Sequence, residues 1–223
     1  MSDNNFKLYG YCSILVSILF FVSLLINNLV YIDTIEQLGT IEYLTQYNSN
    51  SVLFLIYGLV GFIGCIVTFP ATYGIYKFFK KNKDDKQLLI PLIGMFVGLF
   101  FLMAAYTVPI LVALYFAPQV VSGNTDIIPT LLLILATMDI SFFIGSILTF
   151  TVSIGVFSFY NLKNPSFPKT SSYLGMICGI FAIAWVNVFL TGPIAMILLY
   201  FTLINFITFL IWMILMGTTL KKA

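Results

Sequence analysis

Residues 88–116 read LLIPLIGMFVGLFFLMAAYTVPILVALYF, and this stretch without a single charge decides the class of fold. At 1.5 Å per residue, a helix of this length is longer than the roughly 30 Å hydrocarbon core of a bilayer. Five other apolar stretches have a similar character, and they cover residues 8–32, 51–79, 128–160, 172–190 and 193–217. The sequence therefore predicts an all-α integral membrane bundle of six helices.

The composition agrees with this class of protein. Hydrophobic residues make up 61% of the 223 residues and charged residues 8%, whereas roughly 25% of an ordinary soluble domain is charged. The apolar stretches leave no room for a soluble domain, so we predict a single transmembrane domain, residues 1–223. The first stretch is too long for the core of a cleaved signal peptide, and we expect a retained helix there.

The charges separate by side of the membrane. All ten basic residues are lysines, and with the N-terminus inside they all fall on the cytoplasmic side. The connections on the other side contain only acidic charges. Because cytoplasmic connections are enriched in Lys and Arg, we predict that both termini are cytoplasmic. In the longest outer connection, residues 33–50, apolar residues at every third position predict a short interfacial helix: Ile35, Leu38, Ile41 and Leu44.

An internal repeat relates two parts of the chain. Residues 62–69, FIGCIVTF, nearly match residues 143–150, FIGSILTF, at an offset of 81 residues (143 − 62). The same offset aligns Gly64 with Gly145, Gly94 with Gly175, and Gly98 with Gly179. We therefore predict that the hairpin of helices two and three recurs as helices four and five. The copies are two spans apart and share one orientation, which makes a parallel repeat. Helices six and one could be a third pair.

The glycines in the third to fifth helices are predicted packing positions. Small residues four apart let helix backbones approach closely in lipid. Gly94 and Gly98 have this spacing in the third helix, and Gly175 and Gly179 have it in the fifth. Gly145 belongs to a similar series of small residues in the fourth helix.

Asp139 is the charged residue deepest in a predicted span. It follows Asp126 by 13 residues (139 − 126). Asp139 should therefore lie roughly 18–20 Å from the outer surface, near mid-membrane. Asn205 in the last helix has a similar depth, so the two side chains form a candidate hydrogen-bonded pair. Further candidates for a polar core or a ligand site are Ser146, Asn187 and Tyr106. Asp139 either fixes helix orientation or belongs to a functional polar site.

The sequence lacks the residues that several kinds of chemistry require. The chain has no His, and its three cysteines, Cys12, Cys65 and Cys178, lie singly in apolar stretches. Phosphate-binding glycine loops, GxSxG, HExxH and paired intramembrane carboxylates are also missing from the sequence. We therefore predict no metal site, no cofactor, no enzymatic activity and no binding to nucleic acid.

The second half of the chain resembles a known family. The resemblance lies in residues 139–145 (DISFFIG), 167–169 (FPK) and 174–179 (LGMICG), and it extends over residues 130–217. Similar segments occur in a large family of small six-helix prokaryotic membrane proteins, which is described only as a domain of unknown function. Trp212 and Gly217 fall where that family has Trp and Gly, whereas Phe206 stands where it often has Glu. The resemblance implies the six-helix fold, and Phe206 argues against a two-carboxylate mechanism.

Two kinds of function fit these observations. The favoured one is a non-enzymatic accessory or small-ligand-binding component of the cytoplasmic membrane. The alternative is a small-solute or proton-coupled transporter or channel that uses Asp139 and Asn205. The expected partners are the lipid bilayer and either other membrane proteins or a second copy of the chain. A continuous water-accessible cavity that reaches Asp139 would favour transport. A dry, packed interior with a large exposed apolar or small-residue face would favour a partner-binding role.

Overall fold

The computed structural model describes residues 4–29, 39–82 and 86–223, and the regular structure among these residues is helical, without a strand. Six helical spans in this described part are long and apolar enough to cross a membrane. The prediction of an all-α membrane protein with six spans is confirmed at this level.

The six spans are built from continuous and composite helices. The first two are α1 (Asn4–Leu29) and α4 (Ser51–Asn82), with the short α3 (Thr40–Ser49) between them. The third combines η1 (Lys86–Leu88), α5 (Leu89–Leu111), the π-helical η2 (Val112–Phe116) and α6 (Ala117–Val121). The fourth combines α7 (Ile128–Ser146), the π-helical η3 (Ile147–Gly155) and α8 (Val156–Lys163). The fifth is α9 (Lys169–Phe181) with the 3-10 helix η4 (Ala182–Phe189), and the sixth is α10 (Gly192–Lys222).

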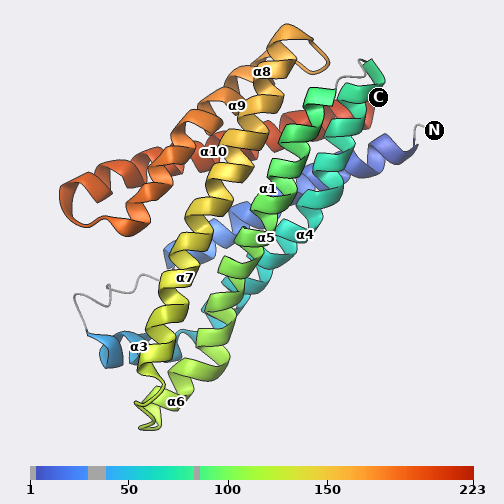
Figure 1. Cartoon of the computed structure of the whole chain (residues 1–223). Helices are drawn as coiled ribbons and strands as arrows, with labels where there is room; N and C mark the ends of the chain where they lie inside the picture. Colours follow the sequence, from blue (N-terminus) through green and yellow to red (C-terminus); the bar gives the residue numbers. More distant parts are fainter. Residues whose placement is uncertain (1–3, 30–38, 83–85) are drawn as a thin grey trace.

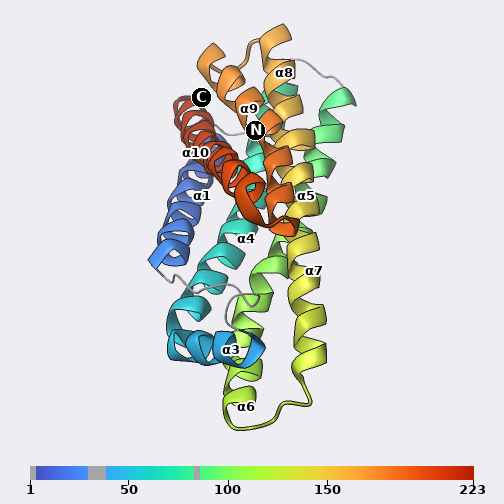
Figure 2. The same cartoon turned by 90° about the vertical axis from the view of Figure 1, so that its left-hand side faces the viewer.

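The spans pack in sequence order around a closed ring. α1 contacts α4, α4 contacts α5, α5 contacts α7 and η3, α9 contacts η3, α8 and α10, and α10 returns to α1. Figures 1 and 2 show the start of α1, the end of α10 and the α8–α9 connection at the same end of the bundle. We call this the lysine end, because the described lysines lie in the helix termini that meet there. The opposite end, with α3 and α6, is the α3 end.

Aromatic rings accompany the lysines. The Lys163 ammonium lies 4.4 Å from the ring centroid of Phe159, and the Lys221 ammonium lies 4.3 Å from that of Tyr11. Both rings are at least half exposed. Lysine beside exposed aromatic rings at helix ends is typical of a membrane–water interface, where the aliphatic stem is apolar and the ammonium stays in water.

The spans differ in length, and this makes the α3 end uneven. The third and fourth spans have 36 residues each, whereas the fifth has 21. As a result, α6 and the first half of α7 extend beyond the turn that joins η4 to α10, and α3 lies beside them (Figures 1 and 2). Gly192 adopts φ 78° at that turn, a conformation that favours glycine.

The predicted short helix in the first outer connection exists as α3. Leu44 and Tyr47 are buried against η2, α6 and α7 in a second apolar core, whereas Ile41 is exposed. The Tyr47 ring stacks on Phe54 with 3.6 Å between centroids, and its hydroxyl donates a 3.2 Å hydrogen bond to the Pro109 carbonyl. The expected positions Ile35 and Leu38 lie outside the described residues. α3 is therefore packed onto the bundle by its own side chains.

The five predicted packing glycines all lie at contacts between helices. A Cβ at Gly98 would be 2.9 Å from the Gly145 carbonyl oxygen, and a Cβ at Gly94 would be 2.8 Å from Val152. A Cβ at Gly179 would be 3.0 Å from the Cα of Gly155. A Cβ at Gly175, the fifth, would be 2.7 Å from the Trp212 indole nitrogen. Each site therefore uses the missing side chain to bring two helices together.

The internal repeat stays a prediction. Gly98 faces the helix that follows it in the ring, whereas its aligned partner Gly179 faces the helix that precedes it. The aligned helices also differ, because η3 is π-helical over residues 147–155 while residues 66–74 are α-helical and include Pro70. The two hairpins therefore pack differently at these positions.

The residues at the contact that closes the ring were not anticipated from the sequence. A Cβ at Gly10 of α1 would lie 2.6 Å from the carbonyl oxygen of Gly217 in α10. Below this approach, the Ser13 hydroxyl donates a 2.6 Å hydrogen bond to the Met213 carbonyl. Small residues and a serine hydroxyl thus join the first span to the last.

Candidate ligand-binding cavity

A cavity of about 310 Å³ lies between the halves of the six spans that are nearest the α3 end. Every span contributes to its lining, and we call it the Asp139 cavity. Its polar lining residues are Ser23, Asn27, Asn28, Tyr57, Tyr106, Asp139, Asn187 and Thr202. Asn27 and Asn28 are exposed, so the cavity extends to the protein surface beside α1.

Asp139 lies near the level at which the shorter spans end. Asn28 in the same lining is next to the last residue of α1, and Asn187 is two residues before the end of η4. The mid-membrane depth expected from the sequence was counted from Asp126. The depth stays a prediction, and its count begins in the extension formed by α6 and the first half of α7, which lies beyond the shorter spans.

Two polar groups of the cavity lack protein partners. The half-buried Asp139 carboxyl makes no hydrogen bond or ion pair with a described residue. The buried Asn187 side-chain oxygen likewise has no hydrogen-bond partner in the described part of the chain. Buried polar groups in folded proteins are normally paired, so unpaired ones beside a cavity indicate positions where water or a ligand binds.

The phenol of Tyr43 on α3 lies within electrostatic reach of Asp139. Burial, and then the negative charge of Asp139, raise the pKa of Tyr43 to about 12. Its hydroxyl therefore stays neutral at physiological pH and keeps its proton to donate. Tyr43 also packs beside Tyr47 on the same helix, with 5.9 Å between ring centroids.

Aromatic rings separate the cavity from the interior. The Phe142 and Trp185 rings are parallel within 7° at 6.1 Å, and Tyr106 meets Phe142 edge to face at 5.2 Å. Tyr57 contacts Tyr106 with 5.5 Å between centroids. We call these four residues the aromatic wall.

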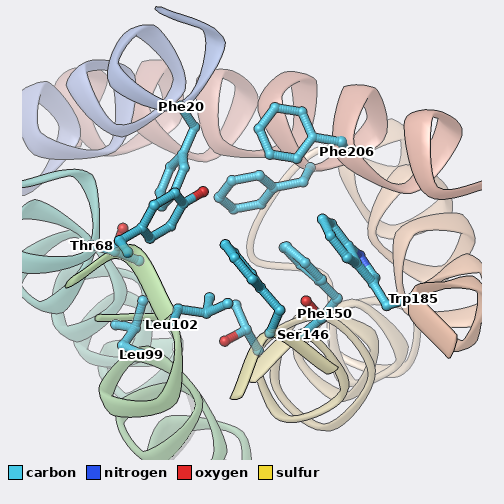
Figure 3. A pocket seen from close by; sticks show the side chains of 12 residues that line it. Phe20, Thr68, Leu99, Leu102, Ser146, Phe150, Trp185 and Phe206 are labelled. Atoms are coloured by element: carbon cyan, nitrogen blue, oxygen red, sulfur yellow. The ribbon is translucent and has the colours of Figure 1, made fainter. Parts of the chain in front are cut away.

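A smaller inner cavity lies on the other side of the aromatic wall. It has a volume of about 20 Å³ and shares Tyr106, Phe142 and Trp185 with the first cavity. Figure 3 shows the side chains around it, including Trp185 from η4. The buried hydroxyls of Ser146 and Thr149 line it and have no hydrogen-bond partner in the described part of the chain. The volume and these hydroxyls suit one bound water.

The predicted Asp139–Asn205 hydrogen bond does not form. The Asn205 amide nitrogen donates to the Cys178 carbonyl at 2.6 Å, and its oxygen accepts from the Trp185 indole at 3.0 Å. Asn205 is fully buried and does not line the Asp139 cavity. Asn205 therefore holds Trp185 in the aromatic wall, and its amide is already used for that purpose.

The other candidate residues predicted from the sequence lie in two different cavities. The structure brings Tyr106 and Asn187 into the same cavity as Asp139, whereas Ser146 lies in the inner cavity. Sequence reasoning missed Tyr57, Tyr43 and Trp185. Trp185 had a usable signal, because it is one of two tryptophans in the chain and lies two residues from Asn187.

The side chains that line the cavity can bind a ligand. No group of three or more His, Cys, Asp or Glu side chains that could hold a metal ion exists among residues 4–29, 39–82 and 86–223. A single carboxylate, amide groups and aromatic rings remain, and these suit recognition of a small molecule.

The fold and the cavity define a multi-pass membrane protein of the helical class. The chain matches no protein-family model, no curated protein and no solved structure.

Proposed function

We propose that this protein is a non-enzymatic component of the cytoplasmic membrane that binds a small ligand in the Asp139 cavity. The observation that carries the proposal is a surface-connected cavity of about 310 Å³ that contains a carboxyl with no hydrogen-bond or ion-pair partner among the described residues. Its size falls at the lower end of the range of small-molecule sites, roughly 300–1,000 Å³. The fixed aromatic wall supports a largely preformed site.

The proposal includes an orientation, with the lysine end in the cytoplasm. The support is that the described lysines share one end, while the described acids Glu42 and Asp126 lie toward the other. The Asp139 cavity would then face away from the cytoplasm.

Cysteine labelling tests this orientation. In intact cells, a membrane-impermeant thiol reagent should label Asp126→Cys and should not label Lys221→Cys until the membrane is opened. The unmodified chain provides the background, because Cys65 and Cys178 are buried whereas Cys12 is partly exposed. Labelling of Lys221→Cys from outside would overturn the orientation.

A cavity-filling variant tests the binding site. Leu203 lines the cavity, so Leu203→Trp places an indole inside it. Leu133 is 68% exposed on the outside of α7, and Leu133→Trp is the matched control. In a thermal-stability screen of small metabolites, we expect compounds that stabilise the wild type and Leu133→Trp but not Leu203→Trp. No stabilising compound, or equal stabilisation of all three proteins, would overturn the proposal.

Transport of the same ligand is a second candidate function. The inner cavity favours it, because Ser146 and Thr149 place partner-free hydroxyls beyond the aromatic wall, toward the lysine end. Phe150 and Phe209 then pack at 5.2 Å between centroids, so passage would require these rings to move. In liposomes, Ser146→Ala should reduce uptake of a bound ligand and leave its affinity unchanged. Binding without any uptake would reject transport and leave ligand binding intact.

A further inference from the structure

We infer that the ligand of the Asp139 cavity is a small organic cation, an ammonium group attached to an apolar body. This inference rests on the proposed binding function and specifies the class of ligand. The first reason is the charge of the cavity. Asp139 is the one formally charged side chain among the described lining residues, and the tyrosines around it, Tyr43, Tyr57 and Tyr106, are neutral phenols. The described lysines lie at the other end of the bundle.

The second reason is the unpaired state of the carboxyl. A carboxylate away from bulk water is costly unless an opposite charge or hydrogen bonds accompany it. No described residue supplies either to Asp139, and the side chain is only half-buried, so a ligand can approach it. An ammonium group would supply both the charge and the hydrogen bonds.

The third reason is the aromatic wall. Tyr57, Tyr106, Phe142 and Trp185 line the same cavity as Asp139. Aromatic rings attract cations through their electron-rich faces, and recognition of quaternary ammonium groups commonly uses aromatic side chains together. The carboxyl would therefore pair with the charge of an organic cation, and the four aromatic rings would pack against its apolar body.

Other classes of ligand suit this lining less well. A metal ion needs several oxygen, nitrogen or sulfur ligands in a fixed geometry, and no group of three such acidic, His or Cys side chains exists in the described part of the chain. An anion would meet the negative Asp139 without a basic residue in the lining to compensate. A neutral apolar molecule would leave the carboxyl unpaired.

The inference can be tested with two probes that differ only in charge. Choline and 3,3-dimethyl-1-butanol have the same shape, but carbon replaces the charged nitrogen in the alcohol. Benzyltrimethylammonium supplies a larger cation. Binding to the purified protein in nanodiscs is followed by calorimetry and by tryptophan fluorescence, because Trp185 lies in the cavity wall whereas Trp212 is fully buried elsewhere.

We expect saturable binding of one or both cations, and affinity for choline at least about tenfold higher than for the neutral alcohol. Asp139→Asn keeps the shape and removes the charge, so it should weaken cation binding by about tenfold or more. The control Asp126→Asn removes an exposed acid outside the cavity and should change nothing. Tyr57→Leu should weaken binding about threefold or more, through the lost ring face.

The outcomes separate this inference from the proposed function. Equal binding of choline and the alcohol, or cation binding unaffected by Asp139→Asn, would overturn the organic cation. Failure of both cations to bind would also overturn it. If Leu203→Trp still abolished stabilisation by a neutral or anionic metabolite, the proposed binding function would stand. If no compound responded to Leu203→Trp, both would fail.

Discussion

Two polar sites, one toward each end of the bundle, differ in how their side chains are paired. At the lysine end, the buried Asn161 side chain donates to the Phe167 carbonyl at 3.1 Å and to the Ser172 hydroxyl at 2.7 Å. Its oxygen accepts from the backbone nitrogens of Ser166 and Phe167, both at 2.9 Å. Toward the α3 end, the Asp139 carboxyl and the Asn187 side-chain oxygen have no partner among the described residues.

This difference distinguishes polar residues that stabilise the fold from polar residues that belong to the proposed binding site. Asn161 uses its full hydrogen-bonding capacity to order the α8–α9 connection. Asp139 and Asn187 contribute nothing comparable to the fold, and they lie where a cavity reaches the surface. Unpaired polar groups reduce stability, so their presence around a cavity is typical of a site shaped for a ligand. The following variants should lower stability strongly at the lysine end and weakly at the cavity.

Asn161→Leu should have the largest effect on folding. It removes four hydrogen bonds and leaves the buried Phe167 donor and the part-buried Ser166 donor of the backbone beside an apolar side chain. We expect the free energy of unfolding to fall by about 3 kcal/mol. Denaturant titration in mixed micelles measures this value. The control Asn187→Leu should change it by less than about 1 kcal/mol, and equal losses in both variants would contradict the difference between the ends.

Gly175→Ala should have the next largest effect. The new Cβ would collide with the Ser158 hydroxyl and lie 2.7 Å from the Trp212 indole nitrogen. These two groups share a 3.1 Å hydrogen bond that joins α8 to α10. Overpacking of this kind should lower the free energy of unfolding by about 1–3 kcal/mol.

Gly155→Ala is the matched control for that substitution. Its Cβ would come no closer than 3.5 Å to a neighbouring atom, which is ordinary van der Waals contact. We expect a change within about 0.5 kcal/mol. If Gly155→Ala destabilised the protein as much as Gly175→Ala, the close contact at Trp212 would not be the cause.

Asn205→Leu tests the boundary between the two regions. It leaves the Trp185 indole and the Cys178 carbonyl without their partner. Because single hydrogen bonds between membrane helices contribute about 0.6 kcal/mol on average, the loss of two should lower the free energy of unfolding by about 1–2 kcal/mol. The Trp185 fluorescence should change as well. The control Thr219→Val removes only a hydrogen bond within α10, to the Leu215 carbonyl, and should leave that fluorescence unchanged.

The positions of the six spans could be predicted from the sequence for clear physical reasons. Long uncharged stretches have one stable form in a bilayer, because every backbone polar group must be paired internally. Asp139, Asn187 and Tyr106 could be grouped because uncompensated polar residues in apolar spans are rare. Residue counting then placed each of them along its helix.

The same counting could not show which way a side chain points. Residue counting gave Asn205 a depth similar to that of Asp139, but the Asn205 side chain points to the Cys178 carbonyl of α9. The π-helical η3 shifts the faces of the fourth span without a signal in its sequence. The extension of α6 and the first half of α7 beyond the shorter spans could not be read from residue counts either, and its apolar core includes Leu44 and Tyr47 of α3.

Asp139→Leu should have the smallest effect on stability and a complete effect on the proposed cation binding. No described residue loses a hydrogen bond when the carboxyl is removed, and a leucine avoids the penalty of a charge away from water. We therefore expect the free energy of unfolding to stay within about 1 kcal/mol of the wild type or to rise, in contrast to Asn161→Leu. Denaturant titration of both variants in the same micelles, together with choline titration, provides the measurement. Asp139→Asn serves as the control for shape, and it should match the leucine variant in stability. A loss of more than about 2 kcal/mol for Asp139→Leu would make this carboxyl a structural residue like Asn161, since a loss of this size is typical of a buried partner left unpaired.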